Sequence, residues 1–297
     1  MSLQAIFLLS APDQPGLVAR FSGFFYELGL NILDASNHTD IVVDDTPRRF
    51  SMRLVVDLAA LGSPQALTRL GESTSRRALE QAFGELATAL GATWSVGYSD
   101  VVERVGLLVT RESSCLYDLI LRQRQGELPC EIAFVASNHP TLESVAESFR
   151  VPFYCLPVTR ETKAEQESRL LDLARKNHVS LIVLARYMQV LSDTFLEQAP
   201  PVINIHHGFL PAFQGAKPYH QAFARGVKLV GATAHYATKD LDEGPIIEQD
   251  VVRVTHAIGP DELVRVGRDV ERVVLARAVR AHLERRVLVA GRRTIVL

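Results

Sequence analysis

The segment "SLIVLARYMQVLSDTFLEQAPPVINI", residues 180–205, changes its hydrophobic pattern twice. It opens with a continuous apolar run, "SLIVLAR" at 180–186, and closes with a second run, "PVINI" at 201–205. Continuous apolar runs of this length are typical of strands that are buried on both faces of a parallel sheet. A mixed polar and apolar stretch between them predicts a short helix, so the segment reads as strand, helix, strand.

The same alternation continues upstream of this segment. "GLLVT" (106–110), "EIAFVAS" (131–137) and "PFYCL" (152–156) each precede a helical pattern, and a long helix is expected over 261–287. Alternating strands and helices predict a parallel sheet with helices on both faces. We therefore expect a mostly parallel, doubly wound α/β domain.

The N-terminal part of the chain follows a different pattern. The spacing predicts a strand at 3–9, a helix at 17–28, strands at 31–38 and 49–58, a helix at 76–91 and a strand at 93–98. This β-α-β-β-α-β order is that of ferredoxin-like α+β domains. A polar stretch at 99–105 separates the two patterns, so we expect one domain over residues 1–98 and another over 99–297.

Composition restricts the class of ligand. The chain has 297 residues and a formal net charge of −2, which gives no basic field for a nucleic-acid partner. No apolar stretch reaches the roughly 18 to 20 residues of a membrane span, so no membrane partner is expected. The three cysteines form no CxxC pair, which favours a reducing cytoplasm over a zinc or disulfide protein. A small-molecule ligand is the expectation that remains.

The chemistry-bearing residues gather after the run at 201–205. Asn204 and His206 stand two positions apart at a strand end and project to the same side, where their N–H groups can stabilise an oxyanion. Downstream, Asp242 stands in the turn "KDLDEGP" and is the carboxylate best placed to complete the site. Acids before Gly-Pro are more often solvated turn formers, so composition alone favours that alternative.

The neighbouring histidines are less informative. His206 and His207 are adjacent in an extended segment and point apart, and HExxH is absent, so no metal site is expected. His207 could be structural or functional, whereas His220 is expected to pack the loop. The glycines and prolines of 208–219 predict a stiff loop that holds the pair facing Asp242.

Two long segments carry a family resemblance. "NIHHGFLPAFQGAKPYHQAF" (204–223) and "GATAHYATKDLDEGPIIEQDV" (231–251) resemble the formyltransferase domain that uses 10-formyltetrahydrofolate. The double histidine and "GAKPY" resemble its deformylase branch. "DQPGLVARFSGFFYELGLNI" (13–32) is similar to the signature of ACT domains, which that branch places ahead of the catalytic domain.

The resemblance implies hydrolysis of 10-formyltetrahydrofolate to formate and tetrahydrofolate, supplying formate for purine biosynthesis. The alternatives are formyl transfer from the same donor to an amine acceptor, and a sensor that binds folate without turning it over. The transferases that act on glycinamide ribonucleotide carry a glycine-rich phosphate turn after their first strand, whereas "VTRESSCLYDL" (109–119) has no glycine. That difference favours water as the acceptor.

The resemblance also assigns residues, with no cofactor beyond the folate substrate and no metal. The catalytic residues are Asn204, His206 and Asp242, with His235 and His207 in support; the folate-binding residues are Met188, Gln189, Val190, Leu191, Thr238, Lys239, Asp240 and Leu241. A plainer interpretation places Met188, Val190 and Leu191 in an ordinary core. A raised pKa of Asp242 would help it to relay a proton to N10 of the folate.

For the ACT-like segment, the expected effector is a small amino acid, glycine or methionine. It would bind at the loop formed by Asp13, Gln14, Pro15, Gly16 and Asn31, where a helix N-terminus suits a carboxylate. Alternatively the segment only joins subunits, and a dimer or tetramer is expected either way. Two departures from the family pattern, Gly208 and Ser114, remove side chains that relatives often carry there.

Overall fold

The computed structural model describes residues 2–40, 48–71, 75–212 and 218–297. The expected stiff loop over 208–219 therefore lies partly outside the described residues. The chain divides into two compact units. The first holds residues 1–101 with 285–290 and 295–297, and the second holds 102–284 with 291–294.

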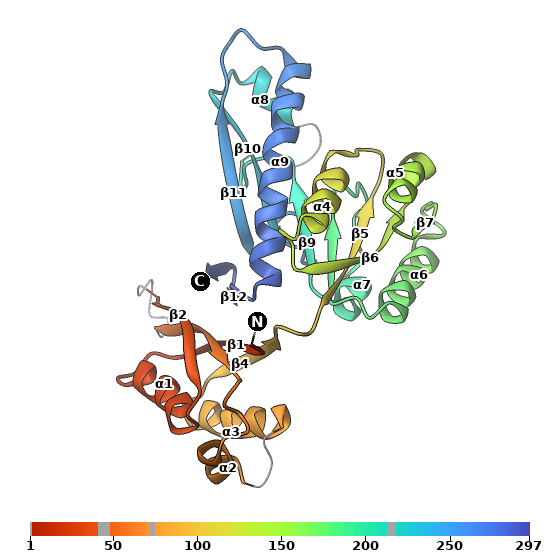
Figure 1. Ribbon diagram of the computed structural model, residues 1–297. Coiled ribbons are helices and arrows are strands. Elements are labelled where there is room, and N and C mark those ends of the chain that lie inside the picture. Colours follow the sequence, from red (N-terminus) through yellow and green to blue (C-terminus); the bar gives the residue numbers. More distant parts are fainter. Residues whose placement is uncertain (1, 41–47, 72–74, 213–217) are drawn as a thin grey trace. The chain divides into compact units, whose positions relative to one another are not determined.

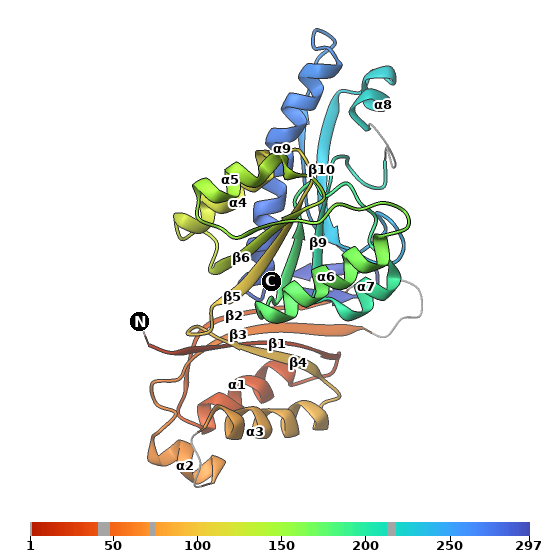
Figure 2. The same cartoon turned by 90° about the vertical axis from the view of Figure 1, so that its right-hand side faces the viewer.

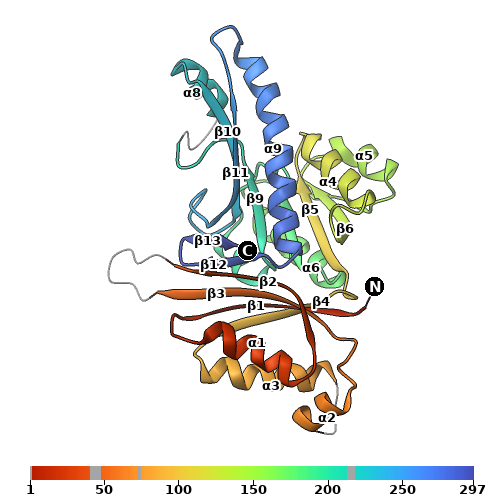
Figure 3. The same ribbon diagram turned by 60° about the vertical axis from the view of Figure 1, so that its left-hand side comes forward.

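The first unit contains one antiparallel sheet. Its elements are β1 (Gln4–Pro12), α1 (Leu17–Glu27), β2 (Asn31–Thr39), β3 (Arg49–Asp57), α2 (Pro64–Leu70), α3 (Arg76–Ala89) and β4 (Thr93–Tyr98). The strand order is β2-β3-β1-β4, and α1 and α3 lie on one face of the sheet (Figure 3). α2 was not predicted from the sequence, although Ser63 followed by Pro64 is a typical helix start, and the Ser63 hydroxyl accepts from the Ala66 N–H.

Aromatic side chains fill the core of the first unit. Phe7 on β1, Phe21 and Phe25 on α1, and Phe83 on α3 are all fully buried. The ring centroids of Phe7 and Phe83 are 4.5 Å apart. Their burial on one face of β1 and on the inner faces of the helices explains the alternating pattern of the sequence.

The second unit contains a seven-stranded sheet. Its elements are β5 (Glu103–Val109), α4 (Ser114–Arg124), β6 (Cys130–Ser137), the 3₁₀ turn η1 (Pro140–Leu142), α5 (Glu143–Ser148), β7 (Phe153–Cys155), α6 (Lys163–Lys176), β8 (Leu181–Leu184), α7 (Asp193–Gln198), β9 (Val202–His206), α8 (Pro218–Ala224), β10 (Leu229–Tyr236), β11 (Ile246–Arg253) and α9 (Pro260–Leu283). A short pair, β12 (Val287–Ala290) and β13 (Arg293–Val296), follows.

The strand order of this sheet is β11-β10-β9-β8-β5-β6-β7. Strands β5 to β9 are parallel, and β10 and β11 are antiparallel to their neighbours. The expected mostly parallel α/β sheet is thus confirmed. The strand β11 was not predicted, because its residues "IIEQDVVR" alternate imperfectly and half-exposed positions weaken the pattern.

Helices cover both faces of the seven-stranded sheet. α4 and α9 lie on one face, and α6 and α7 lie on the other (Figures 1 and 2). α9 packs against β9, β10, β11 and α4. The strands β5, β6, β8 and β9 are therefore largely buried on both faces, as their continuous apolar sequences indicated, whereas the edge strand β7 is only partly buried.

The path of the chain through the sheet positions the site. After β5 the chain adds β6 and β7 on one side, and it then returns to add β8 and β9 on the other. In such sheets ligands bind outside the carboxyl ends of the strands at this switch point. The Met188 N–H, after β8, donates to the Thr110 hydroxyl, after β5, at 3.0 Å and joins the two strand ends across the switch.

Candidate active site

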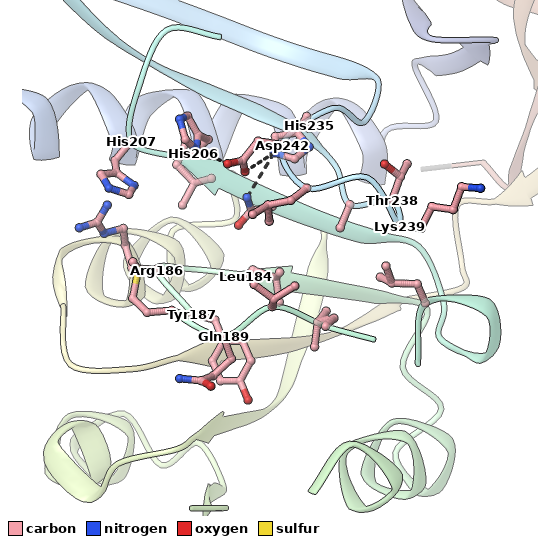
Figure 4. Close-up of a pocket in the computed structure, with 18 of the residues that line it drawn as sticks. Leu184, Arg186, Tyr187, Gln189, His206, His207, His235, Thr238, Lys239 and Asp242 are labelled. Carbon is pink, nitrogen blue, oxygen red and sulfur yellow. Dashed lines mark hydrogen bonds and ion pairs between the residues drawn. The ribbon is translucent and has the colours of Figure 1, made fainter. Parts of the chain in front are cut away.

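A cavity of about 580 Å³ opens at the carboxyl ends of β8 and β9. Three groups of residues from different parts of the sequence supply most of its lining, and Tyr219, His220 and Val264 complete it. The segment after β8, the end of β9 and the loop between β10 and β11 each contribute one wall (Figure 4). The volume suits a small organic ligand.

The pairing of β9 with β10 sets the first contact of the site. Asn204 lies opposite His235 in the antiparallel register, and the Asn204 Nδ2 atom is 3.2 Å from His235 Nε2. The His235 Nδ1 atom is 2.9 Å from the Tyr236 carbonyl oxygen and donates to it in the neutral ring. Nε2 then accepts from Asn204, so His235 fixes the direction of the Asn204 amide.

Asp242 completes the cluster. Its Oδ2 atom lies 3.2 Å from His206 Nδ1, and its Oδ1 atom lies 3.7 Å from His235 Nε2 (Figure 4). Asp242 has a left-handed backbone with a φ of 58°, which turns its side chain back toward β9. The structure therefore brings Asn204, His206 and Asp242 together, and the alternative of a solvated turn acid is wrong, because the Asp242 side chain is only 11% exposed.

The ionisation of Asp242 differs from the sequence expectation. Burial by itself would raise the pKa of this carboxyl, but the hydrogen bond from His206 and the nearby imidazole of His235 outweigh burial and hold the pKa below its usual range. The expected raised pKa is wrong, because two imidazoles face the carboxylate. Asp242 is therefore an anion at neutral pH and suits the role of a base or an orienting group better than that of an acid.

Gly244 allows the loop to approach β10. A Cβ atom at this position would lie 1.7 Å from the Tyr236 carbonyl oxygen and 3.2 Å from His235 Nδ1. The register of β10 and β11 shifts between Ala234 and His235, and the shift brings this loop beside the imidazole. A glycine is needed here because the backbones are in close contact.

The segment 188–191 forms the wall after β8. All four of its residues line the cavity, as the folate assignment requires. The side chains of Met188 and Val190 are 57% and 56% exposed, so the interpretation of these two as core residues is wrong. Leu191 is buried and also packs in the core of this unit, so both interpretations hold for it.

Buried polar contacts hold this segment at both ends. The Gln166 side-chain amide donates to the Tyr187 hydroxyl at 2.6 Å. The Glu167 carboxylate accepts from the backbone N–H of Ser192 at 2.9 Å and from its hydroxyl. The exposed residues Met188 and Val190 thus belong to a segment whose two ends are held by hydrogen bonds to α6.

The loop at 238–242 forms the facing wall. Thr238, Lys239 and Leu241 line the cavity together with Asp242. The side chain of Asp240 is exposed and does not line the cavity, and its carbonyl oxygen accepts from the Thr238 hydroxyl and the Glu243 N–H. The assignment of its backbone to the folate stays a prediction. The role of Asp240 is to close the turn.

Three further residues at the cavity were missed in the sequence. Arg186 and Tyr219 line it, and both contact Glu271 of α9, which is fully buried. The Tyr219 hydroxyl donates to Glu271 Oε1 at 2.7 Å, and Arg186 Nε lies 3.5 Å from Glu271 Oε2. Glu271 sits within a helical pattern of apolar residues, and a lone acid on the buried face of that helix was the available signal.

His207 and His220 differ in their surroundings. Burial lowers the pKa of His207 to about 3, and the Arg186 guanidinium adds to the lowering. His207 is therefore neutral at pH 7 and lines the cavity beside His206. His220 is exposed and also lines the cavity, and the loop that it is expected to pack lies partly outside the described residues.

The predicted effector loop is exposed. Asp13, Gln14, Pro15 and Gly16 are all open to solvent, and Gly16, with a φ of 87°, leads directly into α1. The Gln14 side-chain amide donates to the Leu90 carbonyl at 3.3 Å. The Gly29 and Leu30 N–H groups close α1 by donating to the carbonyl oxygens of Tyr26 and Phe25, and Asn31 begins β2.

Two kinds of structure are absent from the described parts of the chain. Within those residues, no three histidine, cysteine, aspartate or glutamate side chains gather closely enough to hold an ion. Within the same residues, no helix combines the length and the apolar surface that crossing a bilayer requires.

Comparison with known proteins defines the class first. The formyl transferase family matches residues 103–279, which is most of the second unit. A glycinamide ribonucleotide transformylase from Symbiobacterium toebii has a similar structure, with a TM-score of 0.62 and 29% identity over 66% of this chain and 94% of that one. The fold and the site are thus those of a formyl transferase-type protein.

Whole-chain similarity is more specific. The formyltetrahydrofolate deformylase of Synechocystis sp. is 49% identical over 99% of both chains. The crystal structure of a formyltetrahydrofolate deformylase from Pseudomonas syringae pv. tomato has a TM-score of 0.91 and 42% identity, covering 100% of this chain and 95% of that one. This chain belongs to the formyltetrahydrofolate deformylase family, which confirms the family predicted from the sequence.

Proposed function

We propose that this protein hydrolyses 10-formyltetrahydrofolate to formate and tetrahydrofolate. Membership of the deformylase family over the whole chain supports this activity. The observation that carries it is the contact of His206 with Asp242 beside Asn204 at the wall of the cavity. The formate would supply one-carbon reactions such as those of purine biosynthesis.

Water is the nucleophile in this proposal. Its oxygen bonds to the formyl carbon, and the carbonyl oxygen gains negative charge. An N–H of the Asn204 amide and the Nε2–H of a protonated His206 would stabilise that oxyanion. His206 Nε2 is buried and makes no hydrogen bond within the described residues, which leaves it for the substrate.

Asp242 and His206 would divide the proton transfers. The Asp242 carboxylate orients the attacking water and accepts its proton, which replaces the proton that His206 gives to N10. The C–N10 bond breaks when N10 receives a proton, and His206 is a better source than Asp242, whose pKa lies below its usual range. His235 is a positioning residue here, because it fixes the Asn204 amide.

The folate would lie between the segment 188–191 and the loop 238–242. The exposed Met188 and Val190 offer apolar surface, and Gln189, Thr238 and Lys239 offer polar groups at the same cavity. Backbone groups of 238–242 would complete the edge of the pterin. The activity would need no metal or other cofactor, because the imidazole and amide supply the charge stabilisation.

A formate assay tests the proposed activity. Purified protein is incubated with 10-formyltetrahydrofolate in the absence of any amine, and formate and tetrahydrofolate are measured. Equal amounts of both are expected. Formate that appears only after an amine is added, or a formylated amine in its place, would favour the transferase alternative.

We further propose that the first unit is an ACT domain and that it defines a regulatory module over residues 1–98, with the catalytic domain at 99–297. The antiparallel strand order β2-β3-β1-β4 and the exposed turn before α1 support this assignment. Glycine or methionine would bind at residues 13–16 and 31. Titration of the hydrolysis rate with each amino acid tests regulation against a role in assembly alone.

The remaining proposals concern assembly and location. β2 is an exposed edge strand nine residues long, so a second copy could extend the sheet into a dimer or tetramer. Light scattering in solution measures the oligomeric state.

A cytoplasmic location is supported by Cys115, Cys130 and Cys155, which are all free, as in a reducing compartment.

A further inference from the structure

One end of the cavity takes no part in the mechanism above. Arg186, His207 and Tyr219 line it. In Figure 4, Arg186 and His207 face each other on the side of the cavity away from Thr238 and Lys239. With folate against the loop 238–242 and the segment 188–191, a formyl acceptor would enter from the end that Arg186 and His207 line.

Arg186 is fixed at this end by a buried anion. It follows β8 with a left-handed φ of 66°, and its Nε atom lies 3.5 Å from Oε2 of Glu271. Glu271 is fully buried, and its other oxygen accepts from the Tyr219 hydroxyl at 2.7 Å. If the guanidinium moved away from this position, the buried carboxyl group of Glu271 would lose its ion pair with Arg186.

Stability does not account for this arrangement. Burial raises the pKa of Glu271, and a largely buried ion pair costs desolvation that only full hydrogen bonding recovers. Within the described residues, Arg186 Nε and Nη1 and Glu271 Oε2 are buried and make no hydrogen bond. An apolar pair of similar volume would stabilise the fold at least as well. The charged pair is better explained by what it does at the cavity wall.

Relatives with this fold include proteins named as glycinamide ribonucleotide transformylases. A shared fold does not choose the acceptor, so the choice between water and an amine must rest on the side chains at the acceptor end. We propose that Arg186, anchored by Glu271 and Tyr219, occupies the acceptor position and so restricts the formyl acceptor to water. This inference rests on the proposed hydrolytic function.

The two outcomes differ in one bond. With water, a C–O bond forms, the C–N10 bond breaks, one proton from the water goes to N10, and formate leaves with the release of the other. With a primary amine, a new C–N bond forms instead, and the proton goes from the amine to N10. No other reactant is needed, so the product depends on whether the space beside the formyl carbon admits an amine or only water.

The test compares an opened variant with a filled one. Arg186→Ala combined with Glu271→Gln removes the long side chain and leaves no unpaired buried charge, and the Gln can still accept from Tyr219. Arg186→Met combined with Glu271→Gln removes the same charges and keeps most of the volume. Each protein receives 10-formyltetrahydrofolate with and without glycinamide, a small primary amine, and formate and N-formylglycinamide are measured.

The opened variant should form N-formylglycinamide at least about tenfold above the natural protein, a ratio typical of steric discrimination. The filled variant should form formate only. The inference is overturned if the opened variant hydrolyses without forming the amide, or if the filled variant forms it equally. It is also overturned if the natural protein formylates glycinamide, an outcome that needs no folded variant. Formate from the natural protein without amine tests hydrolysis separately.

Discussion

His206 Nδ1 lies 3.2 Å from Oδ2 of Asp242, although one residue ends β9 and the other stands in the loop between β10 and β11. The two side chains are 4% and 11% exposed, so water screens their attraction poorly. The contact orients the imidazole. It is the centre of the proposed hydrolysis.

Asp242→Asn tests this contact. The amide keeps the shape of the side chain but cannot accept a proton or stabilise a charged His206. We expect kcat to fall by about 100-fold or more, with folate affinity within a few-fold of the natural protein. Steady-state kinetics and folate titration measure the two effects.

Asp240→Asn is the matched control. Asp240 lies in the same loop but is exposed and outside the cavity, so its loss of charge should leave kcat nearly unchanged. A near-normal rate for Asp242→Asn would remove that carboxylate from the chemistry.

Gly244→Ala tests the close approach of the loop to β10. A methyl group 1.7 Å from the Tyr236 carbonyl must push the loop away, since backbone rather than a flexible side chain is in its path. We expect the free energy of unfolding to fall by at least about 2 kcal/mol and turnover to fall as His235 shifts. Gly23→Ala, which meets nothing within 4 Å, should leave stability unchanged or improved. Equal denaturation curves for the two variants would refute the argument.

His207 should make stability depend on pH. Its pKa is 6.5 in the unfolded chain and about 3 in the folded protein, so the unfolded state binds the proton first as pH falls. The stability that the neutral His207 contributes is fully retained above pH 6.5. As pH falls from 6.5 toward 3, the free energy of unfolding declines by up to about 1.4 kcal/mol per pH unit. Between pH 7 and pH 5, the free energy of unfolding measured by urea denaturation should therefore fall less for His207→Gln than for the natural protein. The same loss in both would show that His207 does not titrate in this way.

Glu167→Gln tests the support of the folate wall. The variant keeps the size of the side chain but weakens the two bonds that it accepts from Ser192. We expect KM for the folate to rise by about tenfold, with a smaller change in kcat, because the loss of a hydrogen bond to a charged group is worth about 1.5 kcal/mol. Glu165→Gln, on the same helix but exposed, is the control. A fall in melting temperature with an unchanged KM would show a merely structural role.

The sequence predicted the central site well because its signals are local. Asn204 and His206 share a strand end, and their two-residue spacing places them on one side of it. Asp242 was assigned to the site by the family resemblance, but its pKa could not be predicted, because that depends on two imidazoles that only the folded sheet brings near. Arg186, Tyr219 and Glu271 were missed for the same reason: they meet from three elements that are distant in the sequence.

The helices and strands also divide into those with a strong local sequence pattern and those without one. The strands β5, β6, β8 and β9 were predicted because burial on both faces gives continuous apolar runs. β11 is half exposed and α2 is only seven residues long, so neither has a strong periodic pattern. The exposed Met188 and Val190 look like core residues in the sequence, and only the cavity beside them shows why apolar side chains face outward there.

The origin of the oxygen in the product tests the central claim most directly. Hydrolysis is run in water labelled with oxygen-18 with no amine present, and the released formate is examined by mass spectrometry. Attack by water predicts one labelled oxygen in each formate, in step with the tetrahydrofolate formed. Formate without the label, or tetrahydrofolate formed without formate, would contradict the account.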